Sequence, residues 1–240
     1  MHLLIAMRLP LAEVGEFYVV FGTMMVASGL GRIGIDRALT REMARAMAQD
    51  DSMAARRALL RAAGTVAMLS TLLTLLTMLA AWPAAHLVMR QPDMTPLFVL
   101  GALSILPQNL ANLVAGALAG LHRVTQSQIV YTWLWPGIFC IVALVTGMSV
   151  WHAIAAVAIS LSIATVIGAV MLWRSFPPLH AADPPVWTGS LIGTGLSLFS
   201  SEFVQLLISA APPVVLGALA GTEQTGLYAI AWRVVLIIYM

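Results

Sequence analysis

Six long apolar segments recur along this chain of 240 residues, separated by short polar ones. About 20 apolar residues in a helix cross the hydrocarbon core of a bilayer, and runs of that length are uncommon in soluble domains. Apolar side chains make up 60% of the chain and charged ones only 9%, whereas roughly a quarter of the residues of a soluble domain are charged. We therefore predict an all-α, polytopic membrane helical bundle. The predicted spans are Phe17–Ile35, Ala62–Trp82, Met94–Leu121, Ile129–Met148, Ala153–Trp173 and Ser190–Leu219, with a seventh that begins at Gly226.

The arginines indicate how these spans are oriented. The 12 basic residues are all arginine, and eight of them lie in three connections that fall on one side of the membrane, against two on the other side. Basic residues gather in cytoplasmic loops. We therefore predict that Asp36–Arg61, Leu121–Gln128 and Arg174–Trp187 are cytoplasmic and that Pro83–Asp93 lies outside. Asp36–Arg61 is expected to form a basic, interfacial helix, with three arginines at four-residue spacing on one face.

The third cytoplasmic connection divides the chain into two parts. It contains four prolines, which cannot lie in the interior of a regular helix, so we predict a proline-rich linker over residues 175–189. Residues 1–174 would then form nearly one six-helix lobe, and residues 190–240 the first helices of a second lobe. The first span is expected to begin outside the membrane, although Met1–Pro10 does not resemble a signal sequence. We therefore expect the chain to be a fragment that lacks one helix at its start and more at its end.

Two charged residues inside the last apolar segments are candidate site residues. Glu202 lies in the sixth predicted span and Arg233 in the seventh, and intramembrane charges usually face a cavity or a partner. Gln205 lies on the same helix face as Glu202, ahead of a Pro-Pro pair that breaks or kinks the helix. We predict that Glu202 and Arg233 face a central cavity near each other. Static pairing between helices is the alternative interpretation.

Further candidates lie in the first predicted lobe. Gln108, Asn109 and Asn112 form a polar patch in the third span, for which hydrogen bonding between helices is the alternative. Arg37 and Arg41 follow the first span one helical turn apart, where they could clamp an anionic headgroup, or serve only as orientation signals. Arg32, at the membrane boundary, is expected to snorkel to the interface. The single cysteine and the scattered histidines give no spacing for metal ligands, so we expect no metal site and no cofactor.

Three motifs of the chain resemble a known family. They are Glu13–Tyr18, Gly29–Ala44 and Thr225–Arg233, and they look like those of polysaccharide-biosynthesis flippases. These O-antigen-type exporters of lipid-linked oligosaccharides belong to the multidrug/oligosaccharidyl-lipid/polysaccharide exporter superfamily. The resemblance covers the chain as the second to eighth helices of a longer protein. It implies two six-helix lobes around a central cavity, related by a pseudo-twofold axis along the membrane normal, with Gly15 and Gly226 at the starts of equivalent helices.

The resemblance also implies a function. It implies a non-enzymatic flippase of the bacterial cytoplasmic membrane, which moves undecaprenyl-pyrophosphate-linked oligosaccharide to the outer leaflet by alternating access. Its partners would be this lipid-linked oligosaccharide and membrane lipids, with a polysaccharide polymerase as a further candidate and no nucleic acid. On this interpretation the predicted substrate-binding residues are Arg37, Arg41, Gln108, Asn109, Glu202, Gln205 and Arg233.

Two other classes of function stay open. One is a different exporter of the same superfamily, either a drug/cation antiporter or a peptidoglycan-precursor flippase. The other is a membrane-embedded glycosyltransferase or polymerase of the same pathway. The predicted outer loops argue against an enzyme, because Gly147–His152 and Gly221–Thr225 are very short and Pro83–Asp93 is modest. They leave no room for a catalytic domain outside the membrane, and no cluster of carboxylates marks one membrane face.

Overall fold

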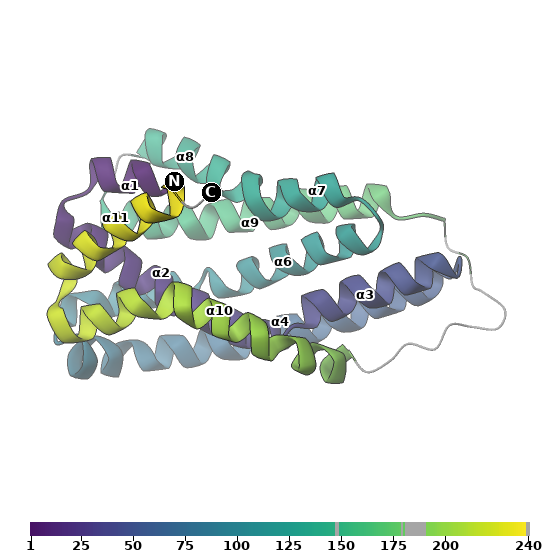
Figure 1. The fold of residues 1–240 in the computed structure, drawn as a ribbon, viewed down its shortest axis with the longest axis horizontal. Helices are drawn as coiled ribbons and strands as arrows, with labels where there is room; N and C mark the ends of the chain where they lie inside the picture. Colours follow the sequence, from purple (N-terminus) through teal and green to yellow (C-terminus); the bar gives the residue numbers. More distant parts are fainter. Residues whose placement is uncertain (147–148, 179, 181–190, 239–240) are drawn as a thin grey trace.

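The structure, a computed structural model, describes residues 1–146, 149–178, 180 and 191–238 (Figure 1). These residues form helices and contain no strand, so the all-α prediction is confirmed. Within these described ranges, six helical segments are long and apolar enough to cross a membrane, and each overlaps one of the six complete predicted spans. They are Leu11–Arg32, Ser52–Val88, Pro92–Gly120, Val124–Val145, Val150–Ser175 and Phe203–Ala220.

Several of these segments combine more than one helical element. The elements of the predicted first lobe are α1 (His2–Arg8), α2 (Leu11–Arg32), α3 (Ile35–Ala48), α4 (Ser52–Pro83), η1 (Ala84–Val88), η2 (Pro92–Met94), α5 (Thr95–Ala102), α6 (Ile105–Gly120), α7 (Val124–Gln128), η3 (Ile129–Leu134), α8 (Trp135–Thr146) and α9 (Val150–Ser175). The elements after the linker are α10 (Leu191–Ala220) and α11 (Thr222–Ile238). Here η1 and η3 are π-helices and η2 is a 3₁₀ turn.

The outward face of the bundle is apolar, as expected for a protein dissolved in lipid. Along α4, the side chains of Leu72, Leu75 and Leu79 are exposed, while small residues such as Ala62 and Ser70 are buried against the other helices. Long apolar side chains on the outside are stable only in an apolar solvent. The chain is therefore a multi-pass membrane protein.

The first span ends three residues earlier than predicted, because the backbone turns left-handed after Arg32. Ile33 has φ 47° and Gly34 has φ 68°, and these two residues separate α2 from α3. The glycine is needed for a second reason: a Cβ at Gly34 would lie 2.5 Å from the backbone oxygen of Gly195 in α10. The chain therefore changes direction where the predicted cytoplasmic segment begins.

The predicted interfacial helix is instead packed against the bundle. Leu39 and Met43 of α3 are fully buried among residues of α4 and α6, and α3 lies alongside the first turns of α4 (Figure 1). Its three arginines at positions 37, 41 and 45 are exposed, as their spacing predicted. α4 has 32 residues, which makes it about 48 Å long and longer than the hydrocarbon core of about 30 Å. α4 is therefore long enough to reach past the hydrocarbon core, and we call α3 and the first turns of α4 the extension.

The start of the predicted linker is bound to this extension. The hydroxyl of Ser52, the first residue of α4, donates a hydrogen bond of 2.7 Å to the carbonyl of Pro178 and accepts one of 2.7 Å from the amide of His180. The amide of Met53 donates to the carbonyl of His180 at 3.0 Å. Residues 181–190, which hold the rest of the predicted linker, lie outside the described residues.

The two glycines that the sequence singles out lie against each other. A Cβ on Gly15 of α2 would overlap the backbone carbonyl of Thr222 in α11, and a Cβ on Gly226 would overlap the backbone carbonyl of Leu11 in α2. The contact is reciprocal. Gly15 faces the carbonyl of the residue four positions before Gly226, and Gly226 faces the carbonyl of the residue four positions before Gly15. Reciprocal contacts of this kind are what a local twofold axis produces. The packing agrees with the implied pseudo-twofold equivalence of these two helices.

The topology can be tested at the two ends of α4. Ala48 and His86 lie just before and just after this membrane-crossing helix, so cysteines at these positions should react on opposite sides of the membrane. In a Cys140→Ala background, a membrane-impermeant maleimide should label His86→Cys in intact cells, and Ala48→Cys only after permeabilisation. Labelling of Ala48→Cys in intact cells would reverse the predicted orientation.

Candidate functional site

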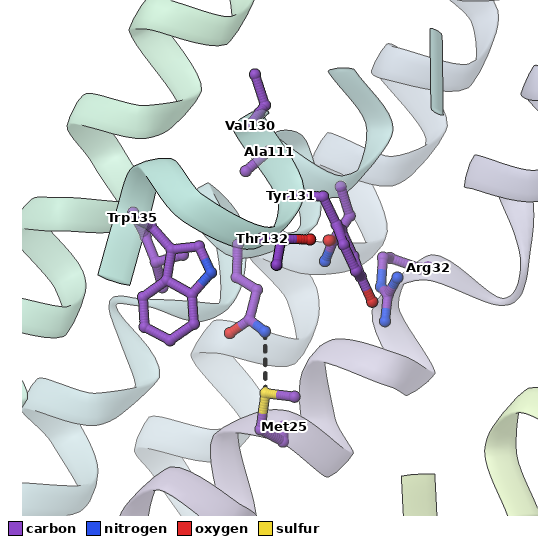
Figure 2. A pocket seen from close by; sticks show the side chains of 10 residues that line it. Met25, Arg32, Ala111, Val130, Tyr131, Thr132 and Trp135 are labelled. Atoms are coloured by element: carbon purple, nitrogen blue, oxygen red, sulfur yellow. Dashed lines mark hydrogen bonds between the residues drawn. The ribbon is translucent and has the colours of Figure 1, made fainter. Parts of the chain in front are cut away.

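Two adjoining polar pockets lie where α2 and α3 meet α6 and η3. The larger has a volume of about 280 Å³ and the smaller about 250 Å³, and both are lined by Arg32, Asn112 and Tyr131. The larger is also lined by Met25, Gln108, Thr132 and Trp135 (Figure 2). The smaller is also lined by Asp36, Arg37, Thr40 and Ser127. Most of the wall comes from α2, α3, α6 and η3, and Ser127 of α7, Trp135 of α8 and Leu161 of α9 complete it.

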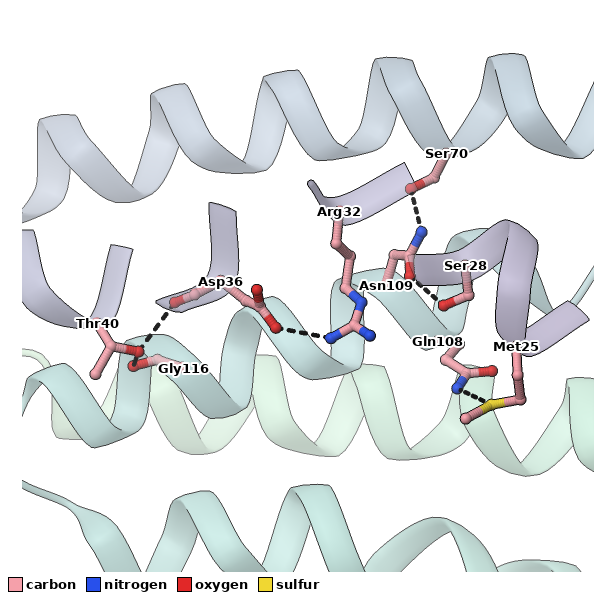
Figure 3. Close-up of polar contacts among 9 residues, drawn as sticks. All are labelled: Met25, Ser28, Arg32, Asp36, Thr40, Ser70, Gln108, Asn109 and Gly116. Carbon is pink, nitrogen blue, oxygen red and sulfur yellow. Dashed lines mark hydrogen bonds and ion pairs between the residues drawn. The ribbon is translucent and has the colours of Figure 1, made fainter. Parts of the chain in front are cut away.

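The small residues of α6 bring α3 to the edge of this site. A Cβ on Gly116 would lie 2.8 Å from the carbonyl oxygen of Asp36, and one on Gly120 would lie 2.7 Å from the Cβ of Met43. The hydroxyl of Thr40 donates to the carbonyl of Gly116 at 2.9 Å (Figure 3). The Gly-Ala-Leu-Ala-Gly sequence at 116–120 thus allows close helix packing, and this packing fixes the position of Asp36.

A buried ion pair occupies the junction of the two pockets. Arg32 Nη1 donates to Asp36 Oδ2 at 2.7 Å, and the two side chains are only 11% and 12% exposed (Figure 3). The expectation that Arg32 snorkels to the interface is therefore wrong, because a carboxylate one turn further along the chain binds it inside the bundle. The four-residue spacing of opposite charges is a signal that could have identified this pair from the sequence.

The π-helix η3 supplies the outer wall. Tyr131 and Thr132 belong to η3, and Trp135 follows directly as the first residue of α8. A π-helix has a wider turn than an α-helix and is frequent at functional sites. Tyr131 and Trp135 both line the larger pocket from positions four residues apart (Figure 2). Their aromatic character and spacing were visible in the sequence, but the π turn was not.

Adjacent residues of the predicted polar patch take different roles. Gln108 lines the larger pocket, and its Nε2 donates to the sulfur of Met25 at 2.9 Å. Asn109 is fully buried: its Nδ2 donates to Ser70 Oγ at 2.8 Å, and its Oδ1 accepts from Ser28 Oγ (Figure 3). Asn109 thus joins α6 to α2 and α4, in keeping with the alternative of hydrogen bonding between helices. It does not line either pocket.

The other predicted site residues are distributed around these pockets. Arg37 lines the smaller pocket, whereas Arg41 lies one turn further along α3 and is exposed without lining it. Gln205 is exposed on α10, away from both pockets. Glu202 belongs to α10 and Arg233 to α11, but the positions of their side chains lie outside what the structure describes. The structure therefore brings Gln108, Asn112 and Arg37 together, and adds Arg32, Tyr131 and Trp135.

Comparison with known proteins gives one match. The model of a family described as polysaccharide biosynthesis protein matches residues 2–240. No curated protein and no solved structure matches the chain. The family match covers nearly the whole sequence and confirms the resemblance found in its motifs. The chain belongs to the polysaccharide biosynthesis protein family, whose members are membrane exporters and flippases.

Proposed function

We propose that this protein moves undecaprenyl-pyrophosphate-linked oligosaccharide from the inner to the outer leaflet of the bacterial cytoplasmic membrane, by alternating access and without catalysing a covalent reaction. The family match over residues 2–240 carries this proposal. The polar pockets beside the α2–α3 junction support it, because they offer cationic and hydrogen-bonding groups at the predicted cytoplasmic end of α2.

The headgroup is the part of the substrate that is difficult to move across the membrane. A sugar loses its hydrogen bonds to water in hydrocarbon, and a pyrophosphate also loses the solvation of its charge. Both costs are offset if polar side chains replace water along the route, and guanidinium groups bind phosphate oxygens with two parallel hydrogen bonds. Arg37 and Arg41 are exposed one turn apart on α3, where a lipid headgroup of the inner leaflet would arrive.

The charged residues of the two helices after the linker have a proposed role in the transport cycle. If Glu202 and Arg233 pair inside the central cavity, a substrate or a proton that breaks the pair would shift the balance between the inward-open and outward-open states. This pairing stays a prediction based on the placement of the charges in the sequence.

Removal of the two exposed arginines tests the headgroup contact. The double variant Arg37→Gln/Arg41→Gln should insert normally and reduce export about tenfold or more, because each charge-assisted hydrogen bond contributes about 1.5–3 kcal/mol. The measurement is translocation of fluorescently labelled undecaprenyl-pyrophosphate-linked oligosaccharide in proteoliposomes. Arg56→Gln is the matched control, since Arg56 is an exposed arginine on the same cytoplasmic extension and lines neither pocket.

Two outcomes would contradict this proposal at different levels. Equal export by the double variant and the wild type would leave these arginines as orientation signals only. A wild-type protein that translocates no lipid-linked oligosaccharide, but transports a drug cation or a peptidoglycan precursor, would overturn the proposed substrate class.

A further inference from the structure

We propose that the larger pocket binds one sugar unit of the substrate headgroup, while the pyrophosphate stays outside it at the exposed face of α3. The inference rests on the proposed function and assigns separate places to the two chemical parts of the headgroup. Arg37 lines the smaller pocket, and the smaller pocket adjoins the larger one at Arg32, Asn112 and Tyr131. A sugar linked directly to a pyrophosphate near Arg37 can therefore reach the larger pocket past the three residues that the two pockets share.

The unsatisfied acceptors of the pockets distinguish a sugar from a phosphate. Gln108 Oε1 and Asp36 Oδ1 are buried and have no hydrogen-bond partner among the described residues. Both are acceptors, so the missing partner must donate a hydrogen bond. A pyrophosphate oxygen carries negative charge and is itself an acceptor, so it cannot donate the missing hydrogen bond. A sugar hydroxyl donates and accepts, and a small rotation of either side chain would present its oxygen to such a group.

The amide of Asn112 adds a second kind of contact. It lines both pockets, and it makes no side-chain hydrogen bond with the described residues. An amide can donate two hydrogen bonds and accept two. The hydroxyls of a sugar ring point outward in several directions and need partners of both types. Asn112 and Gln108 lie four residues apart on α6, so they line the same wall of the pocket.

The aromatic wall suits the apolar face of a sugar ring. Tyr131 and Trp135 line the larger pocket (Figure 2), which Gln108 also lines. The face of an aromatic ring carries partial negative charge, and the C–H groups on one face of a pyranose ring carry partial positive charge. A sugar ring can therefore lie against an aromatic face while its hydroxyls reach the amides. The negative ring faces do not attract a bare phosphate, which carries negative charge itself.

The size of the pocket limits what it holds. Its volume is about 280 Å³, just below the range of about 300–1,000 Å³ that is typical of ligand pockets. This volume fits one sugar ring and excludes a whole oligosaccharide. Further sugars would have to leave the pocket past Tyr131, whose side chain is 57% exposed at its edge.

Two lipids that differ only in the sugar separate this inference from the proposed function. The protein in nanodiscs is titrated with undecaprenyl pyrophosphate and with the same lipid carrying one N-acetylglucosamine. The wild type should bind the sugar-bearing lipid about tenfold more tightly. Trp135→Ala should abolish this difference while leaving the Kd of the bare lipid unchanged. Trp133→Ala is the matched control, because Trp133 lies two residues earlier in η3, is 72% exposed and does not line the pocket.

Gln108→Leu provides a second variant with a smaller change in packing. It removes the unsatisfied acceptor at nearly constant shape and should also weaken only the sugar-bearing lipid. Equal affinity of the wild type for the two lipids would overturn the sugar pocket and leave the proposed function standing. Equal weakening of both lipids by Trp135→Ala would also overturn it. Binding of neither lipid by the wild type would overturn the proposed function itself.

Discussion

Gly15→Val separates α11 from α2 and destabilises the protein by about 3 kcal/mol or more, the upper range for overpacked sites. The added side chain meets the backbone carbonyl of Thr222, and a backbone group cannot rotate away as a side chain can. Gly226→Val should have the same effect, because its Cβ meets the carbonyl of Leu11. The loss is measured as a lower melting temperature of the purified protein, and export should fall with it.

Gly64→Ala is the control for a general effect of replacing glycine. Gly64 lies in α4 and has no atom within 4 Å of the place where a Cβ would be added. Alanine stabilises a helix interior by roughly 0.5–1 kcal/mol relative to glycine, so this variant should keep or raise the melting temperature. A Gly15→Val protein that is as stable as Gly64→Ala would show that α2 and α11 do not cross at these glycines.

Asp36→Asn should destabilise the protein by about 3 kcal/mol, because removing one partner from a buried ion pair has a large cost. The carboxylate that Arg32 Nη1 contacts at 2.7 Å is lost, while the guanidinium stays inside the bundle. Asp50→Asn is the matched control, since Asp50 is exposed in the turn between α3 and α4. Thermal unfolding in detergent measures both variants.

A double variant separates the stability of this ion pair from its function. Replacing both partners of a buried pair by apolar residues is often neutral or stabilising. Arg32→Leu/Asp36→Leu should therefore recover most of the stability lost in Asp36→Asn. Its export should nevertheless be lower than that of the wild type, because both residues line the pockets. Wild-type export by the double variant would exclude this pair from the transport site.

Much of the architecture could be predicted because lipid imposes a simple pattern. A helix that crosses the membrane needs a long apolar run, so the six complete spans could be located without tertiary information. Helix ends were less accurate. The first span was predicted to end at Ile35, whereas the left-handed backbone at Ile33 and Gly34 ends α2 at Arg32. Ile33 and Ile35 on either side of Gly34 are apolar, so the prediction counted them as part of the span.

The candidate site was predicted only in part. Gln108, Asn112 and Arg37 were identified as polar or charged residues in or beside apolar segments, and the structure places them on adjoining pockets. Asn109 has the same character and the same neighbours in sequence, yet it faces away from the pocket toward Ser28 and Ser70. One residue along a helix is a rotation of about 100°, so composition alone cannot tell a pocket residue from a packing residue.

The sequence by itself determined that the protein lies in lipid, where its membrane-crossing helices are and which family it belongs to. These properties depend on composition, on the length of apolar runs and on short motifs. It also marked Gly15 and Gly226 as related positions. Only the tertiary structure decided that these two glycines touch, that the Arg32–Asp36 pair is buried inside the bundle, and that the π turn of η3 brings Tyr131 and Trp135 into one wall. Such contacts depend on the rotation and the crossing of whole helices, which are set by packing between segments far apart in the chain.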